Sequence, residues 1–244
     1  MHRFFVLPEQ IRDGRVRLTG EQARQIVRVL RLGVGDRIVV LDGRGSETEA
    51  EIVQATPAAV EAAVVDQRPC TTEPTVQLTL YQALLKRDKF EWVLQKGTEV
   101  GVARIVPVVT QRSLVQDTRL KENKLNRWQK ILTEAAEQSH RGRVPELAAP
   151  LTWTQAIDDA ARADLALVAW AKASRPLRDI LTDAQSIRSL ALFIGPEGGF
   201  TAAEVKQAAG AGIQSFSLGP RILRTETAAV VASALALYEL EPGP

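Results

Sequence analysis

Two stretches near the end of the chain, FIGPEGGF at residues 193–200 and SLGPRILRTETA at residues 217–228, decide how the rest of the sequence is interpreted. Each joins a hydrophobic segment to the start of a helix through a turn that contains glycine and proline. The segment Thr201-Ala202-Ala203-Glu204, after the first stretch, has the form of a helix capping box. This strand–loop–helix order, found twice, predicts an α/β domain. We call residues 195–200 the glycine loop and residues 217–224 the arginine loop.

The alternation of strands and helices extends backwards from these loops to about residue 75. Period-two or β-branched segments predict strands at residues 76–81, 105–109, 165–169, 190–194 and 213–218. Apolar residues at helical spacing predict helices from about residue 90 to a stop at Gly101, and at residues 121–139, 201–210 and 225–240. Strands that alternate with helices indicate a largely parallel sheet.

The first seventy residues follow a different pattern. Short segments predict strands at residues 15–18, 37–41, 48–53 and 58–65, with one short helix at residues 21–30. Several short strands separated by turns predict a small β-barrel. Two prolines within residues 67–74 indicate a linker. We therefore expect two domains, residues 1–70 and residues 75–244.

The predicted last helix is apolar nearly all the way round, because residues 228–237 contain no charged side chain. A helix without a polar face must be covered on every side. It either lies between layers of its own domain or seals a homodimer, in which small residues would allow a second copy to approach closely. The pattern alone leaves both explanations open.

The composition is that of a globular protein, with 45% hydrophobic and 25% charged residues. No run of about 18 apolar residues exists, and the apolar start of the chain is too short for a secretory signal. The single cysteine, Cys70, has no partner for an intramolecular disulfide and no neighbours for a metal cluster. We therefore expect a cytoplasmic protein without a membrane segment or a bound metal.

Positive charge is concentrated in one part of the chain, although the net charge is only +2. The segment from Arg104 to Arg143, which we call the basic stripe, carries nine basic and four acidic residues. Such a stripe could bind a phosphate backbone, and it could equally be the solvated face of a helix.

The glycine loop has the chemistry of either a cofactor site or a simple turn. Glycine allows a backbone to approach a ligand closely, and free N–H groups at a helix start can hold a polar group. The loop does not match G-x-G-x-x-G and lacks the Lys-Ser/Thr of a phosphate-binding loop. On its own it therefore gives little support to phosphate binding.

The arginine loop ends in an electrostatic conflict. Thr225 suits the N-cap of the last helix, and Glu226 in the first turn would complement the helix dipole. Arg224 would place a cation at the positive end of that dipole, which is unfavourable. We expect an anion, either a bound one or Glu226 itself, to compensate.

Taken together, the two loops resemble the RsmE family, SPOUT-class enzymes that methylate N3 of one uridine in small-subunit ribosomal RNA. Most of the rest of the chain matches the same family. The further matching segments are residues 29–32 with 35–36, 95–102, 127–131, 137–139 and 143–146. The resemblance thus covers nearly the whole sequence.

The resemblance implies both a fold and partners. Residues 1–70 would be a PUA-like RNA-binding β-barrel, and residues 75–244 an α/β SPOUT methyltransferase domain with a parallel sheet and a C-terminal trefoil knot. The cofactor would be S-adenosylmethionine, bound in the knot near the interface of a homodimer formed through the C-terminal helix. The substrate would be 16S ribosomal RNA, either naked or within the small ribosomal subunit.

The resemblance also suggests roles for individual residues. Arg224 would stabilise negative charge on the uracil, and Glu226 would orient Arg224, accept the proton or merely complement the helix dipole. The residues expected to bind the cofactor are Ile194, Gly195, Gly198, Gly199, Leu218, Gly219, Leu223, Thr225, Thr227 and Ala228. Each residue of a basic set would contact RNA phosphate or be an ordinary surface charge: Arg3, Arg28, Arg31, Lys86, Arg87, Lys96, Arg112, Arg141 and Arg143.

Two features separate this chain from the usual family pattern, and other functions stay open. Gln25 stands where many members carry a histidine, and His140 lies in a stretch that varies between members. Since His2 is the only other histidine, histidine base chemistry is not expected. The alternatives are a knotted RNA-binding or ribosome-assembly protein without catalysis, and a nucleotide-binding enzyme that uses the glycine loop for phosphate.

Overall fold

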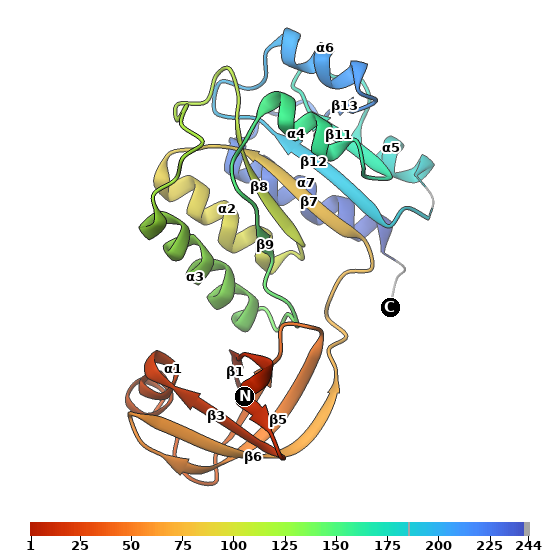
Figure 1. Cartoon of the computed structure of the whole chain (residues 1–244). Helices are drawn as coiled ribbons and strands as arrows, with labels where there is room; N and C mark the ends of the chain where they lie inside the picture. The colour runs from red at the N-terminus through yellow and green to blue at the C-terminus, as the bar shows by residue number, and fades with distance from the viewer. Residues whose placement is uncertain (185, 242–244) are drawn as a thin grey trace. The chain divides into compact units, whose positions relative to one another are not determined.

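The computed structural model describes residues 1–184 and 186–241, with the exception of the side chain at position 87. The chain divides into two compact units. The N-terminal unit contains Met1–Glu73 together with Ala136–Val144, and the C-terminal unit contains Pro74–Ala135 together with Pro145–Pro244. Figure 1 shows the order of the elements along the chain.

The N-terminal unit is built on one six-stranded sheet in the order β1-β4-β5-β6-β3-β2. Its strands are β1 (His2–Phe5), β2 (Ile11–Arg12), β3 (Arg15–Thr19), β4 (Arg37–Leu41), β5 (Ser46–Ala55) and β6 (Ala59–Pro69). β1 runs parallel to β4, and the other neighbouring pairs are antiparallel. A short helix, α1 (Gly20–Arg24), continues into one π-helical turn (Gln25–Val29).

Alternation along these strands creates a single core. Val16 and Leu18 of β3, and Ile38 and Val40 of β4, are fully buried, while their neighbours in β3 are exposed. Ile26 of the π-helical turn belongs to the same cluster. The strands predicted in this part of the sequence are confirmed. The sheet wraps around the core without closing completely, because β1 and β2, at its two edges, are not paired among the described residues.

The C-terminal unit contains the predicted parallel sheet, in the order β10-β8-β7-β12-β11-β13, with β9 beside β8. Every neighbouring pair in it is parallel. Its strands are β7 (Gln77–Ala83), β8 (Arg104–Val109), β9 (Glu146–Leu147), β10 (Leu151–Thr152), β11 (Leu165–Ala169), β12 (Ser189–Ile194) and β13 (Gln214–Phe216). Because the strands are parallel, their carboxyl ends lie along one edge, where ligands bind in open α/β sheets.

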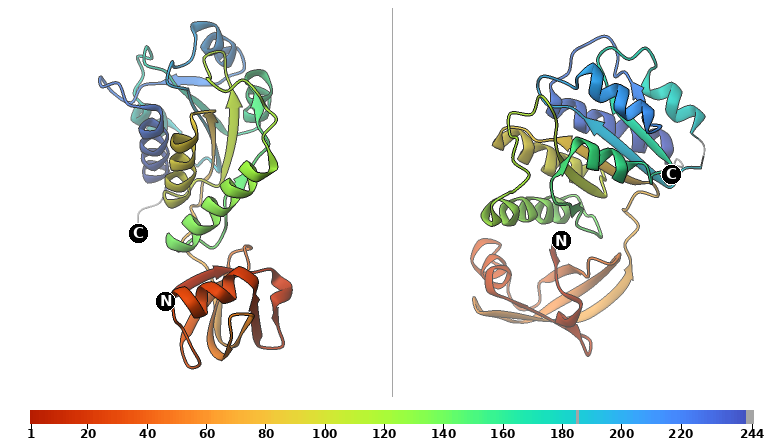
Figure 2. Two further views of the ribbon diagram at one scale, coloured as in Figure 1. Left: turned by 90° about the vertical axis from the view of Figure 1, so that its left-hand side faces the viewer. Right: turned by 45° about the horizontal axis from the view of Figure 1, so that its top comes forward.

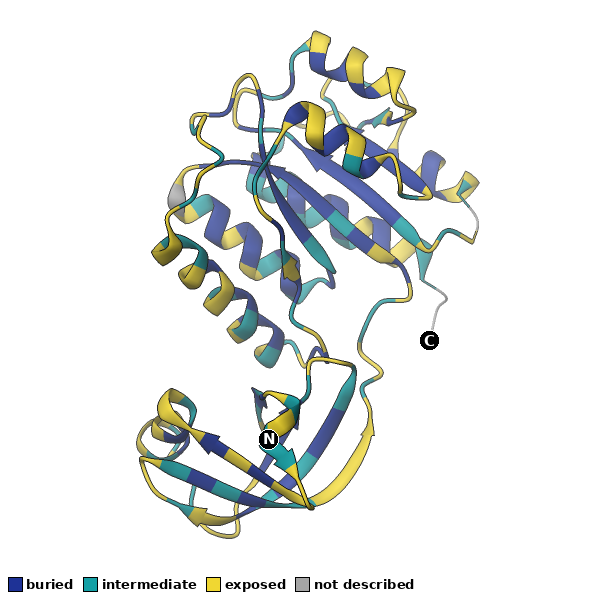
Figure 3. Cartoon of the chain, in the orientation of Figure 1, coloured by how far each residue is buried: buried dark blue, intermediate teal, exposed yellow. Residues whose placement is uncertain are grey.

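Helices cover both faces of this sheet. The helices that follow β7 along the chain are α2 (Arg87–Glu99), α3 (Glu122–Gln138), α4 (Trp153–Ala160), α5 (Leu177–Asp183), α6 (Ala202–Gly210) and α7 (Thr225–Leu240). α2 and α7 pack side by side on one face, whereas α4 packs on the other against β8 and β10 (Figure 2). Apolar residues of the strands and helices form the core between them. Figure 3 shows the strands of this sheet largely in the colour of buried residues.

The structure tests three predictions about the helices that follow the two loops. The capping box is confirmed, since Thr201 Oγ1 accepts a hydrogen bond from the Glu204 amide and α6 follows. α7 has the predicted bounds. The prediction that Thr225 is its N-cap is wrong: Arg224 holds that position, and Thr225 is the first helical residue.

The buried face of α7 is covered by other elements of its own unit. Ala229, Ala232 and Ala236 are buried where the helix packs against α2, α5 and the strands β7 and β12. Leu235 and Tyr238 are 45% and 82% exposed, so part of the helix surface stays open. Among the described residues, no helix is both long and apolar enough to cross a membrane.

Candidate functional site

The two loops meet at the carboxyl edge of the parallel sheet, where Thr225 connects them. Its hydroxyl group donates a hydrogen bond to the carbonyl of Gly195, the first residue of the glycine loop. The same oxygen accepts a hydrogen bond from Gln82 Nε2 at 3.3 Å. Gln82 is fully buried near the end of β7, so three segments far apart in the sequence are fixed to one another through one hydroxyl group.

The glycine loop is held in its conformation from several sides. Gly199 has a φ of +64°, which glycine adopts without strain, and its amide donates to the Pro196 carbonyl at 2.8 Å. Arg112 Nη1 donates to the Gly198 carbonyl at 2.7 Å. A Cβ atom at Gly195 would lie 3.2 Å from the ring of Phe200, which leaves little room for a side chain there. The conformation of this loop is therefore largely set by the protein itself.

The capping box also ties a neighbouring loop to this site. Glu204 Oε2 accepts a hydrogen bond from the Thr201 amide at 2.8 Å. Its other oxygen, Oε1, accepts a hydrogen bond from the Gln111 amide at 2.7 Å. Gln111 follows β8 and precedes Arg112, the residue that binds the glycine loop. One buried carboxylate thus fixes both the start of α6 and the segment that supports the glycine loop.

The arginine loop is anchored at its two ends and free between them. At its start, Ser217 exchanges backbone hydrogen bonds with Arg175 and Leu177. Gly219 has a φ of +101°, and its amide donates to Ser217 Oγ at 3.1 Å. From Arg221 to Arg224, the main-chain N–H groups find no hydrogen-bond acceptor within the described part of the chain. These free donors are available to a ligand.

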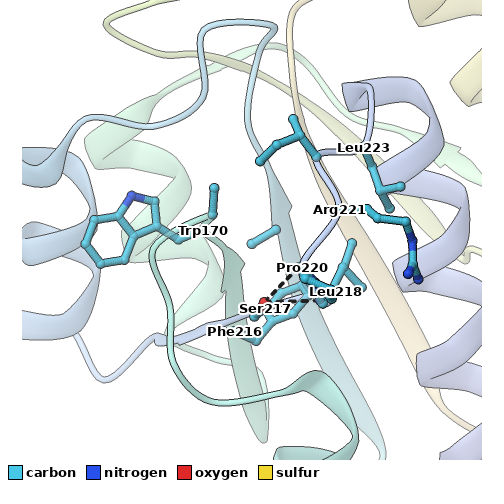
Figure 4. Close-up of a pocket in the computed structure, with 11 residues that line it drawn as sticks. Trp170, Phe216, Ser217, Leu218, Pro220, Arg221 and Leu223 are labelled. Carbon is cyan, nitrogen blue, oxygen red and sulfur yellow. Dashed lines mark hydrogen bonds between the residues drawn. The ribbon is translucent and has the colours of Figure 1, made fainter.

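Two pockets share the arginine loop as a common wall. The first lies between Trp170, Phe216, Leu218 and Leu223, and Figure 4 shows these side chains around it. The second is bounded by the glycine loop, by residues 222–225 and by Lys89 of α2. The predicted cofactor residues that line a pocket are Gly195, Gly198, Gly199, Leu218, Gly219, Leu223 and Thr225. Ile194 is buried at the end of β12, and Thr227 and Ala228 lie in the first turn of α7.

The two predicted catalytic residues, Arg224 and Glu226, form no salt bridge with each other. Arg224 is exposed and forms no salt bridge among the described residues. The side chain of Glu226 is 14% exposed, and the cation beside it is Lys89, whose Nζ lies 3.6 Å from Glu226 Oε2. The same Nζ lies 3.3 Å from Glu197 Oε1 of the glycine loop. Of the two anions expected to compensate Arg224, Glu226 lies beside Lys89 instead, and compensation by a bound anion stays a prediction. Sequence reasoning missed Lys89.

Several of the predicted RNA contacts bind carboxylates of the protein instead. Arg3 Nη1 lies 2.6 Å from Glu47 Oε2, and its side chain is 13% exposed. Arg141 Nη2 lies 2.7 Å from Glu73 Oε2, and its side chain is only 4% exposed. The interpretation of Arg141 as a phosphate contact is corrected on this ground, because its guanidinium is buried in the N-terminal unit.

The other basic candidates differ in how available they are. Lys96 pairs with Glu99 one turn along α2, at 2.8 Å. Arg112 supports the glycine loop, and the side chain of Arg87 lies outside the described part of the structure. Arg112 is nevertheless exposed, as are Arg28, Arg31, Lys86 and Arg143.

Comparison with known proteins gives a consistent result over both units. A family model described as RNA methyltransferase domain matches residues 71–237, and one described as RNA methyltransferase PUA domain matches residues 18–65. The ribosomal RNA small subunit methyltransferase E of Synechocystis is 39% identical over 96% of this chain and 76% of its own length. The protein of the same name from Bacillus subtilis is 33% identical over 99% of this chain and 98% of its own.

A solved structure agrees in fold and carries a ligand. It is the ribosomal RNA small subunit methyltransferase E of Neisseria gonorrhoeae bound to S-adenosyl methionine. Its sequence is 32% identical to this chain, the superposition covers 98% of both chains, and the TM-score is 0.89.

Proposed function

The chain belongs to the ribosomal RNA small subunit methyltransferase E family, and on this premise we propose that it methylates N3 of a uridine in 16S ribosomal RNA with S-adenosylmethionine. The observation that carries the proposal is the joining of the two loops by Thr225 at the carboxyl edge of the parallel sheet. A site at this edge is where an α/β sheet accepts a cofactor.

The residues of the site fit S-adenosylmethionine. A Cβ atom at Gly199 or at Gly219 would meet no protein atom within 4 Å, so the space beside both glycines is open to a ligand. Leu218 and Leu223 offer apolar contacts for an adenine ring, and the unbonded N–H groups from Arg221 to Arg224 offer donors. This mixture of apolar walls with a few polar groups is typical of cofactor pockets.

The mechanism assigns one task to each charged side chain. S-adenosylmethionine supplies a methyl group already activated on a sulfonium. Uracil N3 becomes nucleophilic when its proton leaves, and we assign that proton to the carboxylate of Glu226. Arg224 cannot be a base, because its guanidinium stays protonated. It stabilises the negative charge that spreads onto the uracil carbonyl oxygens as the proton leaves.

The proposal also covers the domains, the knot, the oligomeric state and the cellular location. Residues 1–70, with which residues 136–144 form one compact unit, are the RNA-binding domain. The rest of residues 75–244 is the methyltransferase domain, whose C-terminal segment is knotted and whose last helix forms a homodimer. The exposed Leu235 and Tyr238 on α7 support that interface. Because the substrate is ribosomal RNA, the protein acts in the cytoplasm.

A cofactor titration tests the proposal directly. Gly199→Ala places a methyl group in the open space beside the glycine loop, and it should abolish the heat of S-adenosylmethionine binding in calorimetry. Gly20→Ala is the matched control: Gly20 has the same φ of +64° and equally open surroundings, but lies in the N-terminal unit. Both variants carry the same backbone strain.

The outcomes separate the candidate functions. Unchanged affinity in Gly199→Ala, with both variants folded, would remove the glycine loop from the pocket. Tighter binding of ATP or NAD than of S-adenosylmethionine would favour a nucleotide-binding enzyme. Cofactor binding without methylation of 16S ribosomal RNA would favour an assembly protein.

A further inference from the structure

Lys89 occupies an unusual position for a lysine. It lies in the first turn of α2, at the end of a helix where a positive charge is unfavourable. Its side chain is 34% exposed and reaches carboxylates of two other segments, Glu197 in the glycine loop and Glu226 in α7. These partners lie 108 and 137 positions away in the sequence, so the fold and not a local motif brings the three charges together.

The two carboxylates are held differently. Lys89 Nζ lies 3.3 Å from Glu197 Oε1 and donates a hydrogen bond to it. The distance of 3.6 Å from Nζ to Glu226 Oε2 is too long for a hydrogen bond but short enough for strong attraction. Glu226 Oε2 is itself buried and accepts no hydrogen bond among the described residues. This oxygen is therefore attracted to a cation while its lone pairs stay free.

We propose that Lys89 is a positioning residue for the transfer reaction, which fixes the carboxylate of Glu226 and links it to the glycine loop through Glu197. The inference rests on the proposed function and adds to it the group that orients the proton acceptor. Lys89 acts through Glu226 and does not itself touch the reacting atoms.

The physical reason lies in how the hydrogen-bonding capacity of Lys89 is distributed. Glu197 takes the hydrogen bond, which holds the ammonium group in place. Glu226 is attracted to the charge of that group but accepts no hydrogen bond from it. The Glu226 oxygen can therefore still receive a proton from the substrate. Catalysis is sensitive to such placement, since a shift of about 1 Å can cost on the order of 10²-fold in rate.

Four variants and one control test the proposal in the full-length protein. The variants are Lys89→Met, Lys89→Arg, Glu226→Gln and the double variant Lys89→Met with Glu226→Gln. Lys206→Met, on the exposed surface of α6, controls for loss of a lysine charge. Single-turnover methylation of 16S ribosomal RNA at saturating S-adenosylmethionine is measured for each, and cofactor affinity is measured separately by calorimetry.

Lys89→Met should lower the single-turnover rate by about 10-fold to 10²-fold and change cofactor affinity by less than about 3-fold. Lys89→Arg should recover part of the rate, because it restores the charge with a different geometry. In the Glu226→Gln background, Lys89→Met should cost less than about 2-fold more, because residues that act as a unit are not additive.

The opposite results are equally clear. An equal cost of Lys89→Met in both backgrounds would show that Lys89 does not act through Glu226, and would overturn the proposal. A rate loss matched by an equal loss of cofactor affinity would also overturn it, because Lys89 would then be a cofactor ligand. Absence of S-adenosylmethionine binding in the unaltered protein would instead overturn the proposed function itself.

Discussion

Two arginines of the N-terminal unit, Arg3 and Arg141, and the two arginines of the arginine loop stand in opposite surroundings. In the N-terminal unit, Arg3 binds Glu47 and Arg141 binds Glu73, and both guanidinium groups are largely buried. In the arginine loop, residues 217–224, both arginines are exposed and form no ion pair with the described part of the chain. The difference separates charges that hold the fold together from charges that are free to meet a ligand.

This contrast has an energetic basis. A buried charge must be paired, because desolvation without a partner is costly. An exposed arginine has no such requirement and keeps its donors available. Arg224 is a special case, since it is the N-cap of α7 and its charge lies at the positive end of the helix dipole. An anion that forms during the reaction would be attracted both by the guanidinium of Arg224 and by the positive end of the dipole of α7.

The largest expected effect is therefore on catalysis. Arg224→Ala should lower single-turnover methylation by about 10²–10³-fold, the scale of removing one oxyanion donor, with cofactor saturating. Cofactor affinity and thermal stability should change little, because the side chain is exposed and unpaired. Arg224→Lys should recover only part of the rate, since a point charge does not reproduce the planar fork of a guanidinium. Higher pH should partly rescue Arg224→Ala, because solvent then removes more of the N3 proton.

Two results would remove Arg224 from the mechanism. One is a full single-turnover rate in Arg224→Ala. The other is a defect explained entirely by lost cofactor binding. Either would mean that exposure and lack of a partner do not identify the functional arginine in this chain.

The second prediction concerns the stability of the fold instead of catalysis. Arg141→Ala should lower the free energy of unfolding by about 2–4 kcal/mol, because it leaves the Glu73 carboxylate without its principal buried cation. The amides of Gly142 and Arg143 also donate to Glu73, so the loss would spread along this segment. Urea unfolding of the full chain measures it. Arg143→Ala is the control, two residues away and exposed, and should change stability by less than about 0.5 kcal/mol.

A loss in Arg141→Ala no larger than that of the control would break the comparison. It would mean that the buried arginine is dispensable for folding and that its pairing with Glu73 carries no stability.

The sequence predicted local structure better than it predicted partners. The bounds of α7 follow from apolar composition and from Gly219-Pro220 before it, which are local signals. α4 was missed although Thr152 and Gln155 form a capping box, a signal that the sequence does contain. α5 is only seven residues long and leaves too weak a periodic pattern to be recognised.

The site was harder to predict because its contacts are not local. Both loops could be found, since glycine, proline and arginine mark them in the sequence. Lys89 could not, because a lysine in an amphipathic helix has the pattern of a solvated charge until the sheet order brings it to Glu226. Burial of Arg141 was equally hidden, since its partner Glu73 is 68 residues away.

Acid sensitivity gives the third prediction. Burial of Glu47 raises its pKa, but hydrogen bonds from Arg3 and Arg68 outweigh this, so the pKa of Glu47 is lowered overall. The unfolded chain then binds this proton more readily than the folded one. The stability that the group contributes is therefore complete above about pH 4.5, near the ordinary value for glutamate, and is lost as the pH falls through the lower folded pKa.

Thermal unfolding between pH 7 and pH 3 measures this dependence. Glu47→Gln should be less stable at pH 7 and lose less stability on acidification than the unaltered protein. Glu9→Gln, which removes an exposed carboxylate from the same unit, should follow the unaltered protein. Identical pH dependence in Glu47→Gln and the unaltered protein would show that this pair does not contribute to acid sensitivity.

The smallest expected effect, on RNA affinity, compares the two arginines that lie two positions apart. Each phosphate contact releases counterions, so affinity falls with salt concentration by a slope of about 0.7–0.9 per contact on a logarithmic scale. Arg143 is exposed and can reach a phosphate, whereas the guanidinium of Arg141 is committed to Glu73. Arg143→Ala should therefore weaken binding of 16S ribosomal RNA and flatten the slope by about one unit, while Arg141→Ala should leave the slope unchanged at temperatures where it is folded. Binding isotherms at four salt concentrations between about 50 and 200 mM resolve the difference. If Arg141→Ala flattened the slope and Arg143→Ala did not, the Arg141–Glu73 pair would have to open on RNA, and paired and unpaired arginines would no longer divide into structural and ligand-binding groups.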